Sequence, residues 1–173
     1  MLKKYAFLDR DGTLIYEPTP EETKEGDIPY QIDSLEKLKI LDGVIEGLQK
    51  LQKSAYKLVM VSNQDALGTD IFPQESFDIP HNQMLKIFQE NGIEFVEVLI
   101  CTHKDEDNCK CRKPKTELID MFLNKQNSDW DKENSFICGD SPCDKKLAEN
   151  LGLRFVAMET NSDFGEVIDT FIE

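Results

Sequence analysis

The sequence has no long hydrophobic run. Nowhere in its 173 residues does an apolar stretch approach the ~18 residues needed to span a bilayer. The first ten residues also lack the apolar core and small-residue cleavage site of a secretory signal. We therefore expect no membrane insertion and no export, and we predict a cytoplasmic protein.

Basic residues are scarce. The chain has 20 Lys and Arg against 34 Asp and Glu, which gives a formal net charge of −14. A charge of this sign repels phosphate backbones instead of neutralising them. The composition therefore argues against a nucleic-acid partner.

Cysteines are few and odd in number. Of the five, three lie within residues 101–111, a crowding that argues against a disulfide framework and favours metal ligation. Cys138 falls in a predicted strand and is interpreted as a small buried hydrophobe. Cys143 has no ligand partner nearby in the sequence, and we expect His81 to be structural.

The length suits one domain, which we expect to cover residues 1–173. Short runs rich in Val, Ile, Leu and Phe predict buried strands at residues 5–8, 58–61, 95–100, 136–138 and 155–158. Helical periodicity separates them at residues 44–53, 84–91, 118–125 and 144–150. Such alternation predicts a doubly wound α/β fold, with a mainly parallel sheet and ligands at the carboxyl ends of its strands. Gly92 and Gly152 mark helix ends, and Pro114 is expected just inside a helix start.

Two segments interrupt the alternation. Residues 17–33 are rich in proline and acid and are expected to form a long surface loop. This loop is either a solvated excursion or a wall that faces the substrate. Residues 101–112 are almost entirely polar or cysteine, and we predict that they form a metal-binding loop.

The most informative motif directly follows the first apolar run. It reads Asp9-Arg10-Asp11-Gly12-Thr13, with two carboxylates that can share a cation. An isolated motif of this kind would be interpreted as a polar turn. Further polar residues, however, follow or flank other predicted strands: Ser62, Asn63, Lys113, Asp140 and Asp144. We expect all of them to converge at one edge of the sheet.

These residues resemble the haloacid dehalogenase-like phosphohydrolases over nearly the whole chain. The similarity is carried by D-x-D-G-T at residues 9–13, a hydroxyl at Ser62, Lys113, and G-D-x-x-x-D at residues 139–144. Residues 57–69 (KLVMVSNQDALGT) and 111–115 (CRKPK) look like the histidinol-phosphate phosphatases of histidine biosynthesis. The resemblance implies hydrolysis of a small-molecule phosphate ester and a fold without a large cap domain.

The resemblance also implies a role for each polar residue. Asp9 would be the nucleophile that forms an aspartyl-phosphate, and Asp11 would act as acid and then base. Magnesium would bind the carboxylates of Asp9 and Asp140 and the main-chain carbonyl of Asp11. The phosphoryl group would be contacted by Ser62, the backbone amide of Asn63, and Lys113. Asp144 would orient Lys113.

The cysteine loop has the composition of a closed metal site. Cys101, His103, Cys109 and Cys111 provide three thiolates and one imidazole within eleven residues, a set that fits tetrahedral zinc. The alternative is a group of scattered reduced cysteines. With four protein ligands no position is left for water, so we expect the zinc to shape the loop and position Lys113.

Two further residues concern the substrate and the local backbone. Glu17 starts the acidic loop, and we hypothesise that it binds the cation of histidinol phosphate, although it could be a solvated acid. Ala66 stands where the resemblance implies Gly. If the position needs a positive φ, Ala66 is strained.

Several functions remain open. A heptose bisphosphate phosphatase would share the catalytic and zinc motifs, whereas residues 65–69 favour histidinol phosphate. A phospho-acceptor signalling domain is a second alternative, but it would not need Asp11 as an acid. A polynucleotide end phosphatase conflicts with the net charge of −14. Because the resembled enzymes are often fused to a dehydratase, the chain could be one half of such a protein.

Overall fold

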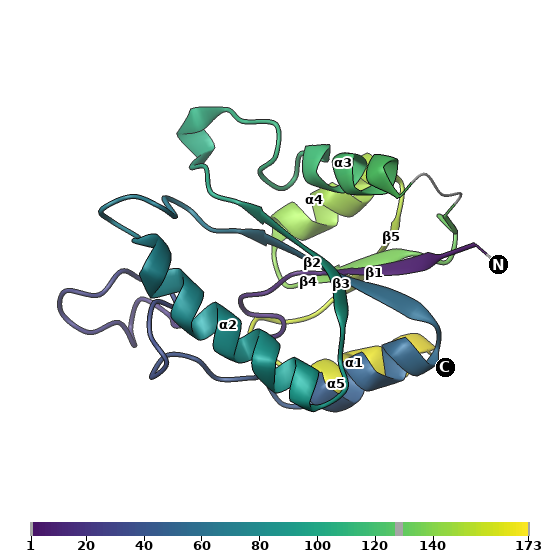
Figure 1. The fold of residues 1–173 in the computed structure, drawn as a ribbon, viewed down its shortest axis with the longest axis horizontal. Helices are drawn as coiled ribbons and strands as arrows, with labels where there is room; N and C mark the ends of the chain where they lie inside the picture. Colours follow the sequence, from purple (N-terminus) through teal and green to yellow (C-terminus); the bar gives the residue numbers. More distant parts are fainter. Residues whose placement is uncertain (1, 127–129, 173) are drawn as a thin grey trace.

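The protein contains a central parallel sheet covered by helices on both faces (Figure 1). The structure, a computed structural model, describes residues 2–126 and 130–172. The strands follow the order β3-β2-β1-β4-β5, and all four pairings are parallel. Their bounds are Lys4–Leu8 (β1), Tyr56–Asn63 (β2), Phe95–Cys101 (β3), Phe136–Gly139 (β4) and Arg154–Ala157 (β5). The predicted doubly wound α/β fold is therefore confirmed.

The helices divide between the two faces of the sheet. In Figure 1, α3 and α4 lie on one side of the strands, and α1, α2 and α5 lie on the other. The helices are Val44–Lys53 (α1), Gln74–Glu90 (α2), Glu117–Lys125 (α3), Pro142–Leu151 (α4) and Phe164–Ile172 (α5), and a 3-10 turn, η1, covers Asp105–Asp107. Among the described residues, no helix is long and apolar enough to cross a membrane.

Each face of the sheet has its own hydrophobic core. Ala6 and Leu8 of β1 belong to the cluster that includes Val44 of α1, while Phe7 belongs to the opposite cluster with Phe122 of α3. Because both faces are buried, the central strands are continuously apolar instead of alternating. This packing holds the carboxyl ends of β1, β2 and β4 at one edge of the sheet.

Three features differ from the sequence predictions. Helix α2 begins at Gln74, ten residues before the predicted start, and contains Pro80. Helix α5 was not predicted. The prediction that Pro114 lies inside a helix start is wrong, because α3 begins at Glu117 and the Lys113-Pro114 peptide bond is cis. Gly92 and Gly152 do follow helix ends, with φ of 72° and 64°.

A glycine after β1 brings two strand ends close together. Gly12 has a φ of 74°, a value in the left-handed region that favours glycine. A Cβ atom at this position would lie 2.4 Å from Asp140 Oδ2. The absence of a side chain at Gly12 therefore lets the carboxylate that follows β4 approach the motif that follows β1.

Candidate active site

The predicted polar residues surround one cavity at the carboxyl edge of the sheet. It has a volume of about 380 Å³, and Asp9, Asp11, Asn63, Lys113 and Asp140 line it. Ser62 and Asp144 are almost fully buried beside these residues. The rim is formed partly by the loop of residues 17–33, which supports the interpretation of that loop as a wall facing the substrate.

Lys113 is the centre of the buried charge network. Its Nζ lies 2.6 Å from Asp9 Oδ1 and 2.7 Å from Asp144 Oδ1, and it also donates to the Val61 carbonyl at 2.9 Å. Burial alone would lower the pKa of Lys113, but the carboxylates of Asp9 and Asp144 raise it above its ordinary value. Lys113 is therefore a fixed positive charge directly beside Asp9.

The surroundings of Asp9 raise its pKa. Burial raises its pKa well above the usual range, the Lys113 ammonium lowers it, and the nearby Asp144 and Asp11 carboxylates raise it. Thr13 donates a hydrogen bond from Oγ1 to Asp9 Oδ2 at 3.3 Å. Lys113 and Thr13 thus bind different oxygens of Asp9 and fix the plane of its carboxyl group.

Two side chains fix the position of Lys113. Asn63 makes a reciprocal pair with its backbone, because Lys113 N donates to Asn63 Oδ1 at 3.0 Å and Asn63 Nδ2 donates to the Lys113 carbonyl at 3.2 Å. Asp144 is fixed in turn, since its Oδ2 accepts hydrogen bonds from the Ser141 backbone N–H at 3.2 Å and the Ser141 hydroxyl at 2.5 Å. The sequence predicts a role for the backbone amide of Asn63 only, and the contacts of its side chain with Lys113 are a finding of the structure.

Asp11 accepts hydrogen bonds from three side chains. Arg10 Nη1 lies 2.7 Å from Asp11 Oδ1, and Gln64 Nε2 lies 2.5 Å from Asp11 Oδ2. Ser62 Oγ is 3.4 Å from Asp11 Oδ2 and also accepts from Gln64 at 2.7 Å. Arg10 is 0% exposed and lies 4.8 Å from the centroid of the Phe77 ring. These contacts orient the Asp11 carboxyl group from behind the cavity.

The carboxylates at the cavity outnumber the bases paired with them. Thr13 Oγ1 lies 3.4 Å from Asp140 Oδ1, and Thr160 donates to Asp140 Oδ2 at 2.6 Å. Counted together, the acids Asp9, Asp11, Asp140 and Asp144 and the two bases that form ion pairs among them, Lys113 and Arg10, have a formal net charge of −2. A divalent cation bound to hard oxygen ligands would offset this charge.

Asp9, Asp140 and Asp144 offer ligand atoms within 4.8 Å of one another. Asp144, however, is 1% exposed and does not line the cavity, whereas Asp9 and Asp140 do. Asp9 and Asp140 are therefore the available side-chain ligands for this cation.

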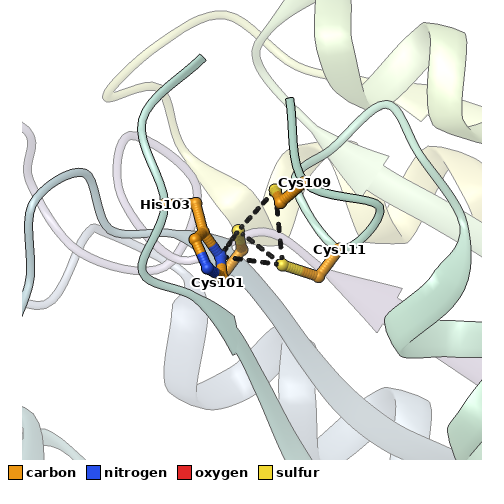
Figure 2. A group of neighbouring side chains, drawn as sticks. All are labelled: Cys101, His103, Cys109 and Cys111. Carbon is orange, nitrogen blue, oxygen red and sulfur yellow. Dashed lines mark hydrogen bonds between the residues drawn. The ribbon is translucent and has the colours of Figure 1, made fainter. Parts of the chain in front are cut away.

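A second group of potential ligands lies beside the cavity. Figure 2 shows Cys101, His103, Cys109 and Cys111 converging on one point. The Cys101 and Cys111 sulfurs are 3.0 Å apart, the Cys101 and Cys109 sulfurs 3.7 Å, and His103 Nδ1 is 3.2 Å from Cys111 Sγ. Tetrahedral zinc with Zn–S bonds of 2.3 Å separates its sulfurs by about 3.8 Å. The donor set therefore fits a closed tetrahedral metal site, with sulfurs that lie 3.0–3.7 Å apart, closer together than around a bound zinc ion.

Arg112 connects this cluster to the cavity. Its backbone N–H donates to Cys109 Sγ at 3.3 Å, and its side chain forms an ion pair with Asp65. Both Arg112 and Asp65 line the cavity, and Lys113 is the next residue in the chain. The cysteine loop is therefore linked through Arg112 to the backbone next to Lys113.

Glu17 lies at the start of the rim loop. Its backbone is clamped by Asn161, whose Oδ1 accepts from Glu17 N at 2.8 Å and whose Nδ2 donates to the Glu17 carbonyl at 3.0 Å. Burial, together with the charges of Asp11 and Asp140 and against the lowering effect of Lys113, raises the pKa of Glu17 to about 7. The Glu17 carboxyl group is thus placed where a cationic ligand would stabilise its ionised form.

Several functional contacts were missed from the sequence. They involve Arg10, Gln64, Thr160 and Asn161. Thr160 and Asn161 follow β5, so the rule that ligands gather at the carboxyl ends of parallel strands could have found them. Gln64 directly follows Ser62 and Asn63, which could also have drawn attention to it.

The backbone at Ala66 has the positive φ that the resemblance implied for this position. Its φ is 62°, in the left-handed region where alanine is strained. Cys138 is fully buried in β4, as expected for a small hydrophobe, while Cys143 lines the cavity. His81 is buried and stacks on Phe77 with ring centroids 4.7 Å apart.

Comparison with known sequences identifies relatives. The family model described as polynucleotide kinase 3 phosphatase matches residues 4–161. The histidine biosynthesis bifunctional protein HisB of Actinobacillus pleuropneumoniae serotype 3 is 54% identical over 154 residues, covering 89% of this chain and 40% of the relative. The HisB protein of Legionella pneumophila (strain Lens) is 41% identical over 171 residues, covering 99% of this chain and 46% of the relative. The chain therefore spans less than half the length of these curated relatives.

Solved structures agree on the fold. A D,D-heptose 1,7-bisphosphate phosphatase from B. bronchiseptica, complexed with magnesium and phosphate, superposes with a TM-score of 0.73 at 20% identity, covering 97% of this chain and 86% of that chain. A putative HAD-like phosphatase from Mesorhizobium loti gives a TM-score of 0.72 at 18% identity, with 97% and 85% covered. The chain belongs to the polynucleotide kinase 3 phosphatase family and has the haloacid dehalogenase-like fold.

Proposed function

We propose that the chain is a magnesium-dependent phosphoric monoester hydrolase that converts L-histidinol phosphate to L-histidinol and phosphate. The observation that carries the proposal is the Asp9–Lys113–Asp144 network at the floor of a cavity that Asp11 and Asp140 also line. The substrate is suggested by the high identity to bifunctional histidine-biosynthesis proteins.

The first chemical step joins Asp9 to the substrate. A magnesium ion bound to Asp9, Asp140 and the Asp11 carbonyl would neutralise charge on the phosphoryl oxygens. An oxygen of Asp9 attacks phosphorus, and the bond from phosphorus to the alcohol oxygen breaks. Asp11 gives its proton to the departing alkoxide, so that the alcohol leaves neutral.

The second step returns the enzyme to its starting state. Asp11, now a carboxylate, takes a proton from water as that water attacks phosphorus. The bond between phosphorus and Asp9 breaks, and inorganic phosphate is released. Lys113 and the Ser62 hydroxyl would hold the phosphoryl group through both steps, since both lie within 3.5 Å of a catalytic carboxylate.

The cysteine cluster is proposed to hold structural zinc. Three sulfurs and one imidazole nitrogen complete a tetrahedral set, so no ligand position is left for a reacting water. The role of the zinc would be to hold residues 101–112, and through Arg112 and Lys113 the wall of the cavity.

The proposal includes the organisation of the chain. Residues 1–173 would form one phosphatase domain, and the relatives' greater length agrees with a fused second domain such as a dehydratase. A polynucleotide substrate is disfavoured in spite of the family's description, because the net charge of −14 repels a phosphate backbone.

The test is phosphate release from histidinol phosphate under steady-state conditions, with and without magnesium. Many turnovers per chain that require magnesium would support the proposal. A stoichiometric burst of histidinol without release of phosphate, the phosphoryl group remaining on Asp9, would favour a phospho-acceptor domain instead. Release of neither histidinol nor phosphate would contradict both.

A further inference from the structure

The loop of residues 17–33 supplies an apolar lip to an otherwise polar cavity. Ile28, Pro29 and Tyr30 are consecutive and all line the cavity; we call residues 28–30 the apolar lip. The loop is fixed on both sides of the lip. Ile32 is 1% exposed within the hydrophobic core, and the Glu17 backbone is clamped by Asn161. The lip is therefore held in place beside the catalytic residues.

Tyr30 combines an unfavourable backbone with an exposed ring. Its φ is 65°, in the left-handed region that tyrosine rarely adopts. Its N–H donates to the Pro18 carbonyl at 3.1 Å, which closes the loop, and its side chain is 55% exposed. The hydrophobic core gains little from this ring. Strained backbone positions of this kind concentrate at functional sites, so a role for the ring in binding would explain both features.

The reaction geometry brings the leaving group toward the mouth of the cavity. Phosphoryl transfer needs the attacking and leaving oxygens roughly in line, so the leaving group departs on the side away from Asp9. Asp9 and Lys113 are at the floor of the cavity, and the apolar lip belongs to its exposed rim. The part of the substrate beyond the phosphate therefore meets the lip.

The charge of the cavity restricts what can bind there. The cavity is lined by more acids than bases. The five acids are Asp9, Asp11, Glu17, Asp65 and Asp140, and the two bases are Arg112 and Lys113. Arg112 is already paired with Asp65, and Lys113 with Asp9. A second phosphate on the leaving group would find no unpaired cation among these lining residues, whereas a planar, cationic group suits both the acids and the exposed ring.

The geometry points to Tyr30 as the residue that stacks on the ring of the leaving group and thereby selects an aromatic phosphate ester. This inference rests on the proposed function, in which that ring is the imidazole of histidinol phosphate. Stacking on an aromatic side chain needs only a planar partner at van der Waals distance. The contribution of Tyr30 should therefore depend on whether the substrate has a ring.

The experiment compares two substrates on the magnesium-loaded chain: histidinol phosphate, and O-phosphoethanolamine, which keeps an ammonium and lacks a ring. The test variant is Tyr30→Gly, because glycine removes the ring and accepts the positive φ without strain. We expect KM for histidinol phosphate to rise about tenfold, with kcat within twofold and no change in KM for O-phosphoethanolamine. Tyr30→Phe should restore the wild-type KM because it keeps the ring.

Leu35→Ala is the matched control. Leu35 is 53% exposed, lies close to the loop in sequence and is absent from the cavity wall, so its replacement should leave both KM values unchanged. If the wild type does not prefer histidinol phosphate over O-phosphoethanolamine, the proposed function and this inference both fail. If the wild type prefers it and Tyr30→Gly retains that preference, the inference alone is contradicted. An equal rise in KM for both substrates also contradicts it.

Discussion

Individual residues at the floor of the cavity have separate tasks because each is held by different contacts. Lys113 holds one oxygen of Asp9 and Thr13 approaches the other, while Arg10 and Gln64 orient Asp11. The proposed nucleophile and the proposed acid are thus positioned by independent sets of donors. A substitution at one of them should remove its own function without displacing the other.

Replacing Asp9 by Asn should abolish turnover and preserve the fold. The amide keeps the shape of the side chain but loses both the nucleophilic oxygen and a magnesium ligand. We expect kcat below about one hundredth of wild type, measured by phosphate release. Asp169→Asn is the control, because it removes a carboxylate that pairs with Lys50 on the surface and should leave kcat unchanged. Turnover of Asp9→Asn above one hundredth would reject Asp9 as the nucleophile.

Replacing Glu17 by Ala should weaken selection for a cationic substrate. Losing the partner of a partly desolvated charge typically costs about 2 kcal/mol or more, so kcat/KM for histidinol phosphate should fall tens-fold. A phosphate ester whose leaving group is uncharged should be hydrolysed by the variant at nearly the wild-type rate. Glu21→Ala is the control, since Glu21 is exposed on the same loop and does not line the cavity. An equal loss with both substrates would remove Glu17 from substrate recognition.

At the scale of structural elements, the cysteine loop should depend on its metal. We expect about one tightly bound zinc per chain, and Cys109→Ser should lose that zinc. It should also lose activity, because the Cys109 sulfur accepts the Arg112 N–H next to Lys113. Elemental analysis and phosphate release measure the two effects. Lys110→Ser, at an exposed position between two ligands, should retain both. Metal-free wild-type protein with freely alkylated cysteines would contradict the zinc site.

The free energy of unfolding should depend on pH through His81, which lies in α2. Burial and, to a smaller extent, the Arg10 charge lower the pKa of His81 to about 4. The unfolded chain has a histidine pKa of about 6.5 and therefore binds the proton first as pH falls. The native state loses stability as pH drops below about 6.5, by about 3 kcal/mol at most near pH 4.

Urea unfolding of wild type and His81→Phe at two pH values measures this effect. Between pH 7 and 5.5 the wild type should lose about 1 kcal/mol more than the variant. His103 and all carboxylates are present in both proteins, so the difference isolates His81. Asp11 and Asp78 are the nearby acids that act on His81 in the opposite direction. Identical pH dependence of the two proteins would show that His81 titrates normally.

The elements were predictable to different degrees, for physical reasons. The central strands are buried on both faces and therefore appear in the sequence as apolar runs. The first half of α2 was missed because Asp78, Pro80 and His81 interrupt its apolar periodicity. Short α5 follows β5 near the end of the described chain, and its apolar residues at Phe164, Ile168 and Phe171 pack on α1 and neighbouring strands.

The site residues were also predictable from the sequence to different degrees. The metal cluster was predictable because its four ligands lie within eleven residues. The contacts of Gln64 with Asp11 and of Thr160 with Asp140 were not, because they depend on side-chain directions that tertiary packing decides. Sequence motifs thus indicated which residues meet, and the structure adds how each is oriented.

At the scale of the whole molecule, the strand order assembles the site from distant parts of the chain. Lys113 and Asp9 are 104 residues apart, and Thr13 and Asp140 are 127 residues apart. Because β1 lies between β2 and β4, the residues after all three strands meet at one edge. The molecule as a whole carries a net charge of −14, so binding a phosphate ester depends on the few cations concentrated at this edge.

The most direct test of the account is the preference of the wild-type chain among three phosphate esters with magnesium present. They are histidinol phosphate, D-glycero-D-manno-heptose 1,7-bisphosphate and an ester with an uncharged leaving group, such as phenyl phosphate. The three are compared by kcat/KM for phosphate release. The acidic rim and the paired Arg112 predict that histidinol phosphate is preferred over the heptose at least tens-fold. A higher kcat/KM for the heptose bisphosphate would contradict the account.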